Sequence, residues 1–285
     1  MFNPFKETWK IEVIESGSFK LDGGAMMGSV PKVLWERTNP SDKLNRIDLS
    51  MRCLLLDNGK DVILIETGIG NKISQKFIDM FCIEQSNFPL KDKLKKCGYT
   101  LDDITNVILT HLHFDNVGGA TYFNGAEIVP TFPNAKYIIS KSNWDAAINP
   151  NPKDRASYLS ENFISIQKNR QLELVEDNQK IMDGIESIAV NGHTTGQQLI
   201  KITVGNQHLV FCSDLIPLKS HLKIPWIMGY DLNATQTLKE KTIFLDEASE
   251  KKWVLFLYHD PKTVAVRIKK NDKYYEVVDE CLVYE

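Results

Sequence analysis

The chain has few cysteines, no long apolar run and no excess of positive charge, and each shortage excludes a class of protein. The five cysteines are odd in number and form no Cys-x-x-Cys pair, which argues for reduced thiols rather than a disulfide framework. No apolar run approaches membrane length, and charges interrupt the N-terminal segment where a signal peptide needs an apolar core. A net charge of -3 gives no electrostatic footprint for nucleic acid. We therefore expect a cytoplasmic protein that binds neither membrane nor nucleic acid.

What is present is the composition of an ordinary globular protein. Of the 285 residues, 42% are hydrophobic and 25% are charged, as in soluble proteins with a substantial core. This length is compatible with one large domain or two small ones. Because no shift in composition, short repeat or low-complexity segment marks a boundary, we expect a single domain over residues 1–285.

Strand-like and helix-like segments alternate along both halves of the chain. Apolar, β-branched runs predict strands at 9–15, 51–56, 61–66, 107–110, 135–140, 185–190, 199–204, 208–212, 253–258 and 264–268. Helical spacing predicts helices at 73–81, 89–97, 141–148, 158–168 and 234–251. Tight turns, such as the Asn-Gly turn at 57–60, join many strands. The expected fold is an α/β (α+β) sandwich of two mixed, mostly antiparallel sheets with helices on both outer faces.

The segment Thr110–Gly119, THLHFDNVGG, has the spacing of a metal site. His111 and His113 stand two residues apart after an apolar strand, so both imidazoles point to the same side of extended backbone. Neutral imidazole is the commonest metal ligand and suits zinc or iron. Asp115 continues the alternation where the chain turns, so its carboxylate can reach a neighbouring position. Histidines at a strand end can also be ordinary core or surface residues, but the regular His-x-His-x-Asp spacing favours a metal site.

Three more residues of ligand type stand at the ends of predicted strands. His193 lies between two glycines in the segment NGHTTG, directly after a strand. Asp214 ends an apolar strand, a costly place for a charge unless it is paired or bound to metal. His259 ends another strand in the same way. Ligand-type residues at four strand ends indicate a site at one edge of a sandwich.

Together these segments resemble the metallo-β-lactamase superfamily, whose motifs are His-x-His-x-Asp-His, Gly-His-Thr-x-Gly, a later Asp and a last His. The resemblance implies a first metal held by His111, His113 and His193. It implies a second metal held by Asp115, by the residue at position 116 and by His259. It also implies that Asp214 bridges the two metals.

Other segments are similar to one subgroup, the YtnP-like quorum-quenching lactonases. They are residues 21–28, 30–35, 225–231 and 256–260, and with the motifs the likeness covers nearly the whole chain. The subgroup is related to the N-acyl homoserine lactonases and, more distantly, to methyl parathion hydrolase.

The sequence departs from the family pattern at the metal site itself. Asn116 replaces the family's histidine, and Glu66 stands where the family usually has aspartate. An asparagine oxygen is a neutral, weak ligand for zinc. We therefore predict one strong Zn²⁺ site and a second, weakened site that takes Mn²⁺ or Fe²⁺ or stays partly empty.

The resemblance implies a metal-dependent hydrolase of carboxylic esters or lactones, most similar to N-acyl homoserine lactonases and acting through a metal-bound hydroxide. Asp115 and Asp214 are the expected catalytic residues, with Asp115 passing a proton to the leaving group. Better-known lactonases have a tyrosine shortly after the bridging aspartate, and His221 is the expected substitute here. The candidates for an acyl-chain pocket are Met26, Met27, Trp35 and Trp226, although a single apolar residue of this kind is more often part of the core.

Two alternatives to a lactonase remain. A glyoxalase-II-like thioesterase shares the Gly-His-Thr loop, although the basic C-terminal segment expected of that group is not evident. A ligand-binding protein with weakened catalysis on the same fold would explain Asn116 and Glu66. The expected partner is a small lactone or ester, and the oligomeric state is open, with a homodimer as one option.

Overall fold

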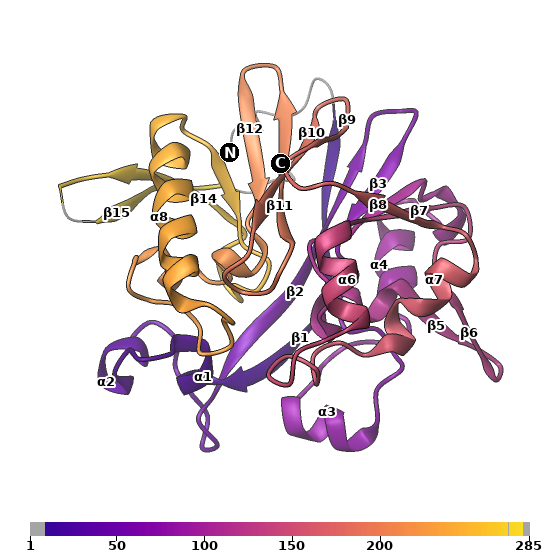
Figure 1. Cartoon of the computed structure of the whole chain (residues 1–285), viewed down its shortest axis with the longest axis horizontal. Coiled ribbons are helices and arrows are strands. Elements are labelled where there is room, and N and C mark those ends of the chain that lie inside the picture. Colours follow the sequence, from indigo (N-terminus) through magenta and orange to yellow (C-terminus); the bar gives the residue numbers. More distant parts are fainter. Residues whose placement is uncertain (1–8, 273, 282–285) are drawn as a thin grey trace.

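The computed structural model describes residues 9–272 and 274–281, and its frame is two large β-sheets (Figure 1). The first sheet has the order β1-β2-β3-β4-β7-β8. Its strands are β1 (Lys10–Asp22), β2 (Arg46–Asp57), β3 (Val62–Ile65), β4 (Asn106–Ile108), β7 (Lys136–Ser140) and β8 (Leu172–Val175). The second sheet has the order β15-β14-β13-β12-β11-β10-β9. Its strands are β9 (Lys180–Met182), β10 (Ile185–Val190), β11 (Gln197–Val204), β12 (Gln207–Phe211), β13 (Val254–Phe256), β14 (Ala265–Lys270) and β15 (Tyr275–Cys281).

Helices cover the outer side of each sheet (Figure 1). On the first sheet, α4 (Pro89–Lys96) packs against β1, and α6 (Lys141–Ile148) packs against β7 and β8. On the second, α8 (Ala234–Glu250) packs against β14. The remaining helices are α1 (Gly23–Met27), α2 (Lys32–Trp35), α3 (Gln75–Phe81), α5 (Phe114–Val117) and α7 (Ile164–Lys168), and β5 (Thr121–Asn124) pairs with β6 (Glu127–Pro130). This arrangement confirms the predicted αββα sandwich.

Strand direction differs between the two sheets. In the first, β1, β2 and β3 pair antiparallel, whereas β3, β4, β7 and β8 run parallel. In the second, only the β12–β13 pair is parallel among the described strands. Parallel neighbours need long crossover connections, and helices α3, α4 and α6 occupy the crossovers of the first sheet. The expected antiparallel majority therefore describes the second sheet better than the first.

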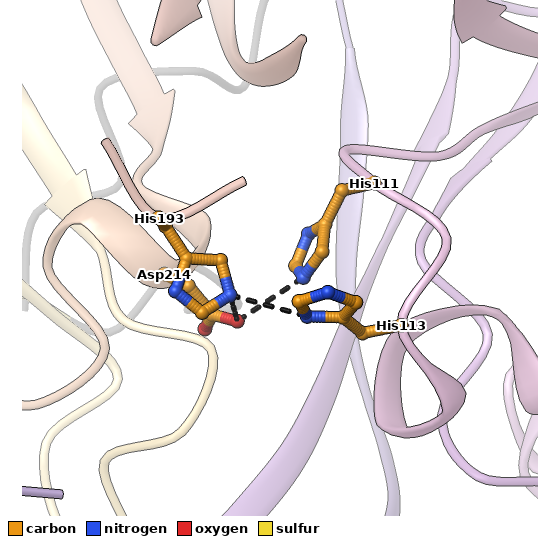
Figure 2. Close-up of side chains that lie close together, drawn as sticks. All are labelled: His111, His113, His193 and Asp214. Atoms are coloured by element: carbon orange, nitrogen blue, oxygen red, sulfur yellow. Dashed lines mark hydrogen bonds and ion pairs between the residues drawn. The ribbon is translucent and has the colours of Figure 1, made fainter. Parts of the chain in front are cut away.

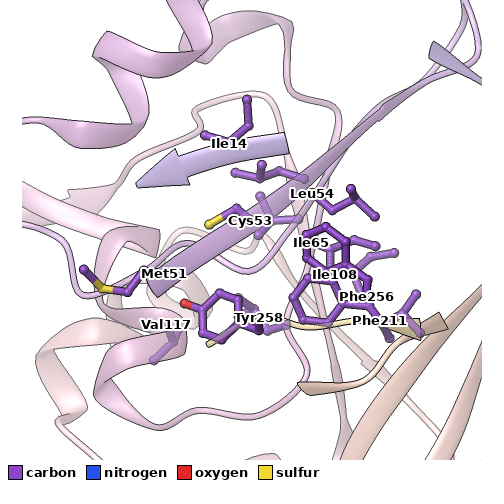
Figure 3. Packing of buried hydrophobic residues seen from close by; sticks show 14 of the residues in the cluster. Ile14, Met51, Cys53, Leu54, Ile65, Ile108, Val117, Phe211, Phe256 and Tyr258 are labelled. Carbon is purple, nitrogen blue, oxygen red and sulfur yellow. The ribbon is translucent and has the colours of Figure 1, made fainter. Parts of the chain in front are cut away.

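The core lies between the sheets (Figure 3). Ile65 and Ile108 reach it from the first sheet, and Phe211 and Phe256 reach it from the second, with their rings stacked at a centroid separation of 5.1 Å. All four side chains are almost fully buried. Burying a side chain of this size stabilises a fold by about 1.5–3 kcal/mol. The strand ends that carry the predicted metal ligands therefore project from a well-packed platform.

Several predicted elements differ in their bounds. α3 begins at Gln75 because the Ser74 hydroxyl accepts a hydrogen bond from Phe77 N and caps the helix. The helix predicted at 158–168 is reduced to α7 and a 3₁₀ turn at Ser160–Asn162, and Tyr158 instead places its hydroxyl beside Thr194 Oγ1. β1 continues through a bulge between Glu15 and Gly17 to Asp22, well beyond its predicted end.

In the described part of the chain, no helix is long and apolar enough to cross a membrane. The thiols of Cys53, Cys82, Cys97 and Cys212 are free. The side chain of Cys281, and residues 1–8 of the N-terminal segment considered above, lie outside the described residues.

Candidate metal centre

His111 and His113 follow β4, where the backbone is held by the second sheet. Gln198 donates hydrogen bonds to Leu109 O and Thr110 O through its side chain and its main chain. The Nδ1 atom of His111 lies 3.0 Å from Thr110 Oγ1, so Nε2 faces the site. His113 then takes the N-cap position of α5, which brings the next two residues into a helical turn. The extended pair followed by a turn is the geometry predicted from the spacing.

Gly118 and Gly119 allow α5 to lie against the segment after β3. A Cβ atom on Gly118 would lie 1.9 Å from Ile69 O, and one on Gly119 would lie 2.2 Å from Thr67 O. The buried Lys72 ammonium fixes the same contact, because its Nζ donates to Gly118 O and Thr121 O at 2.5 and 2.6 Å. Only residues without a side chain permit this approach, so the two glycines determine where α5 sits.

His193 and Asp214 come from the second sheet. His193 follows β10, and the neighbouring Gly192 packs so closely that a Cβ atom there would lie 2.4 Å from Thr237 N in α8. Asp214 lies in a 3₁₀ turn, Ser213–Leu215, directly after β12. The Ser213 hydroxyl lies 2.7 Å from Thr110 Oγ1 and so links this turn to the histidine strand. The site is thus assembled across the two sheets.

Four donor atoms of these residues converge (Figure 2). His193 Nε2 lies 3.2 Å from His113 Nδ1, and Asp214 Oδ2 lies 3.3 Å from both His111 Nε2 and His193 Nε2. All four atoms lie within 4.8 Å of one another. Tetrahedral ligands about 2.0–2.1 Å from a zinc ion are separated by about 3.3 Å from each other. Three of the distances in the donor set therefore match the spacing of a tetrahedral zinc site.

The protonation of His111, His113 and Asp214 also suits a cation. Burial lowers the pKa of His111 to about 4, and burial together with the neighbouring histidines lowers the pKa of His113 well below its usual value. Both rings are therefore neutral at pH 7, and each offers a lone pair. Burial opposes ionisation of Asp214, but His259 and the hydrogen bond from His111 hold its pKa well below the usual range. Neutral imidazoles beside an ionised carboxylate form a metal-binding set.

A second, looser group shares Asp214. His259 Nε2 lies 3.2 Å from Asp214 Oδ1 and 3.6 Å from Asp115 Oδ2. The other nitrogen of His259, Nδ1, lies 2.9 Å from Ser50 O, which orients the ring. The structure thus brings all six predicted ligands to one place and sets Asp115 and Asp214 at its centre.

Asn116, next to Asp115 in the chain, and Glu66, whose carboxyl group interacts electrostatically with Asp115 and Asp214, are both buried near this second group. Asn116 is fully buried, and neither its Oδ1 nor its Nδ2 has a hydrogen-bond partner among the described residues. Glu66, at φ +66°, accepts a hydrogen bond from Thr110 N at 2.7 Å through Oε1, whereas its buried Oε2 has no partner there. Burial raises the pKa of Glu66 to about 8, so its carboxyl group is largely protonated at pH 7. It thus adds little negative charge beside the second group.

Asp231 is a supporting residue whose role is not predicted from the sequence. Its Oδ1 lies 2.9 Å from His193 Nδ1, so it orients the imidazole and directs Nε2 into the cluster. The Lys153 ammonium donates in turn to Asp231 O. The segment 225–231 that contains Asp231 resembles the lactonase subgroup, but no local pattern links Asp231 to His193.

A pocket of about 530 Å³ opens above the donor atoms. One wall is apolar and rich in aromatic side chains, with Phe77 and Phe81 of α3 in contact with Phe114 of α5. Met26 and Met228 also line the pocket. The polar side chains outside the two ligand groups are Ser74, Lys76, Lys153, Asp154, Ser157 and Tyr230. A small molecule with an apolar chain and a polar head matches this division.

Of the predicted substrate contacts, only Met26 lines this pocket. Met27, Trp35 and Trp226 lie in the hydrophobic core instead, and the Trp35 ring closes over Gly23. His221 is fully buried, and its Nε2 lies 2.9 Å from Met26 O, so it supports the backbone behind the wall. Four of the five predicted substrate contacts therefore do not line the pocket, and aromatic residues of α3 line it instead.

Comparisons with known proteins agree with this architecture. The model of the metallo-beta-lactamase superfamily matches residues 49–259. An N-acyl homoserine lactonase of Bacillus cereus is 26% identical over 232 residues, covering 76% of this chain and 83% of the relative. The crystal structure of a probable metal-dependent hydrolase from Staphylococcus aureus aligns with a TM-score of 0.89 and 27% identity over 96% of this chain and 97% of that one.

The dizinc quorum-quenching lactonase AidC, solved with a product, aligns with a TM-score of 0.81 and 21% identity over 98% of this chain and 96% of that one. At this identity the likeness concerns the fold alone. With the match to residues 49–259 and the converging donor atoms, the chain belongs to the metallo-β-lactamase superfamily.

Proposed function

We propose that the protein is a metal-dependent hydrolase that opens a lactone or cleaves a small carboxylic ester, most similar in action to an N-acyl homoserine lactonase. The observation that carries this proposal is the set of four donor atoms, 3.2–3.3 Å apart along three edges, below a pocket with an apolar wall. The names of the relatives support the same reaction class.

Two metal positions follow from the donor sets. His111 Nε2, His113 Nδ1, His193 Nε2 and Asp214 Oδ2 would hold the first, for which zinc suits the tetrahedral spacing. Asp115, His259 and the second oxygen of Asp214 would hold the other. This second set is rich in oxygen and receives no imidazole from position 116, so it suits manganese or iron and binds more weakly.

The chemistry that a divalent cation supplies here is Lewis acidity, which lowers the pKa of water and polarises a carbonyl group. The chain's own residues supply position and proton transfer. Asp231 keeps His193 oriented, and Ser50 O does the same for His259. The Asp115 carboxylate faces the pocket beside His259, where it can pass a proton to a leaving alkoxide. Phe77, Phe81 and Phe114 form the surface on which an acyl chain lies.

A ligand-binding protein with weakened catalysis is the second candidate, and one observation favours it. Both polar atoms of the buried Asn116 side chain lack partners, at the position where the superfamily supplies a histidine. Membership of the YtnP-like subgroup, the single-domain organisation and a homodimeric state stay predictions.

Metal content and lactone hydrolysis test the proposal together. Purified protein should hold one tightly bound zinc per chain, and added zinc, manganese or iron should accelerate hydrolysis of N-hexanoyl homoserine lactone. Two tightly held equivalents would contradict the weakened second site. Tight binding of the lactone without turnover under any of the three metals would contradict the enzyme and favour the binding protein.

A further inference from the structure

Asp154 is an acidic side chain on the pocket wall that the metal groups do not use. It is 5% exposed and lines the pocket beside His113 and His193. The other carboxylates that line the pocket are Asp115 and Asp214, and both belong to the ligand groups. The position of Asp154 is therefore not explained by metal binding.

The hydrogen bonding of this carboxylate is incomplete. Thr194 Oγ1 donates to Oδ2 over 3.4 Å, which is long for a bond between two oxygens. The other oxygen, Oδ1, is buried and has no partner among the described residues. A buried carboxylate oxygen without a donor is destabilising. A donor arriving with a ligand would remove that penalty.

The loop that carries Asp154 is fixed in place. Asn151 Oδ1 accepts hydrogen bonds from the main-chain nitrogens of Lys153 and Asp154 at 2.8 and 3.3 Å. Ser157 N donates to Asp154 O, and Phe114 N donates to Ser157 O at 2.9 Å, which ties the loop to α5. The backbone that carries Asp154 is thus held in place beside α5, on the pocket that His113 and His193 also line.

The surroundings limit the kind of donor that fits. Lys76 and Lys153 line the same pocket, and a metal cation would offset the charges of Asp115 and Asp214, so a further cationic group such as an ammonium would be disfavoured. A neutral N–H group on a ligand whose remainder is apolar suits both this oxygen and the aromatic wall. In an N-acylated lactone, an amide N–H stands next to the ring that is opened.

We propose that Asp154 accepts a hydrogen bond from the substrate amide N–H and so selects N-acylated lactones over lactones without that donor. This inference rests on the proposed lactonase function. A site that pairs with a substrate N–H strongly disfavours analogues lacking it, because its own polar group is left unpaired.

The test compares N-hexanoyl homoserine lactone with the matched lactone in which an ester oxygen replaces the amide N–H. Zinc-loaded wild-type protein should prefer the amide by about 10- to 100-fold in kcat/KM, the range expected for a hydrogen bond to a charged acceptor. Asp154→Ala should reduce the preference to near unity by lowering activity on the amide alone. Asp154→Asn keeps one acceptor oxygen and should give an intermediate preference. Arg155→Ala, on the exposed side of the same loop, is the control and should leave the preference unchanged.

The outcomes separate this inference from the proposed function. Equal use of both lactones by the wild type would overturn the role of Asp154 and leave the lactonase standing. Equal losses on both substrates in Asp154→Ala, or loss of bound zinc, would show a structural role and overturn it too. No turnover of either lactone by the zinc-loaded wild type would overturn the lactonase and, with it, the role of Asp154. If Asp154→Ala does not fold, Asp154→Asn decides, and an unchanged preference in that variant overturns the role.

Discussion

The two ligand groups share Asp214 but differ in the spacing of their donor atoms and in the completeness of their ligand sets. In the first, three of the distances between donor atoms are 3.2–3.3 Å, and His111 and His193 each contact a polar group through their second nitrogen. In the second, His259 lies 3.6 Å from Asp115, and Asn116 contributes a buried amide without a partner. A single side chain thus separates a complete donor set from an incomplete one.

The difference is confined to the side chain of Asn116, because its backbone is held independently. Thr67 donates to Asn116 O from both its main-chain nitrogen and its hydroxyl, each at 2.9 Å. Lys72 and the two glycines fix the following turn. The backbone at position 116 is therefore in place for a stronger ligand. The comparison can be tested by removing a ligand from the first group or by adding one to the second.

The largest effect is expected from removing one ligand of the first group. His193→Ala should lower metal affinity and kcat/KM by more than about 100-fold, since losing even an outer partner of a ligand costs about 10- to 100-fold. His259→Ala should lose only the weaker metal. Metal analysis after dialysis, with lactone hydrolysis, measures both. His208→Ala, outside the pocket on β12, serves as the control, and equal metal loss in the His193 and His259 variants would contradict the comparison.

The next effect is expected from Asp231, which orients the ligand His193 but is not itself a predicted ligand. Asp231→Asn should weaken the first metal by about 10- to 100-fold, because the amide leaves the His193 ring less firmly oriented and less basic. Competition with a zinc chelator measures this affinity. Asp177→Asn, on the exposed surface, is the matched control. An unchanged affinity in Asp231→Asn would show that the loop alone orients His193.

A smaller effect in the opposite direction is expected at the second group. Asn116→His should raise affinity for a second metal by about 10-fold or more, because an imidazole replaces a weak amide ligand. Activity should rise with it if the second metal takes part in catalysis. Titration with zinc, followed by isothermal calorimetry, counts the sites. One site of unchanged affinity would mean that the second position does not bind metal in this chain.

The smallest effect on catalysis is expected from substitution of Lys72, which should instead lower the stability of the fold. Lys72→Met leaves Gly118 O and Thr121 O without their ammonium donor, which should lower the free energy of unfolding by about 1–3 kcal/mol. Thermal melting would show a fall of about 2–4 °C per kcal/mol. Lys91→Met, at an exposed position of α4, should change it by less than about 0.5 kcal/mol. A similar melting temperature for both variants would contradict this role.

The metal centre could be predicted from sequence because its signals are local. The i, i+2 spacing of His111 and His113 sets their direction, and an aspartate at the end of a buried strand signals a site through its desolvation cost. The supporting residues could not be predicted. Asp231 reaches His193, and Asp154 reaches Thr194, only because loops far apart in sequence meet there, and no periodicity encodes that meeting. For Met27 and Trp35 the sequence shows apolarity alone, which a core position and a pocket wall satisfy equally.

His113 occupies the N-cap of the helical turn that carries Asp115 and Asn116. A cation that immobilises His113 in the first group would therefore also restrict the motion of α5. Asp115 would then lose less conformational entropy on binding a second cation. The two positions should consequently fill in order, the first assisting the second. In the proposed two-metal centre, that coupling would run through one turn of helix, and the apparent affinity of the weaker position would depend on occupancy of the stronger one.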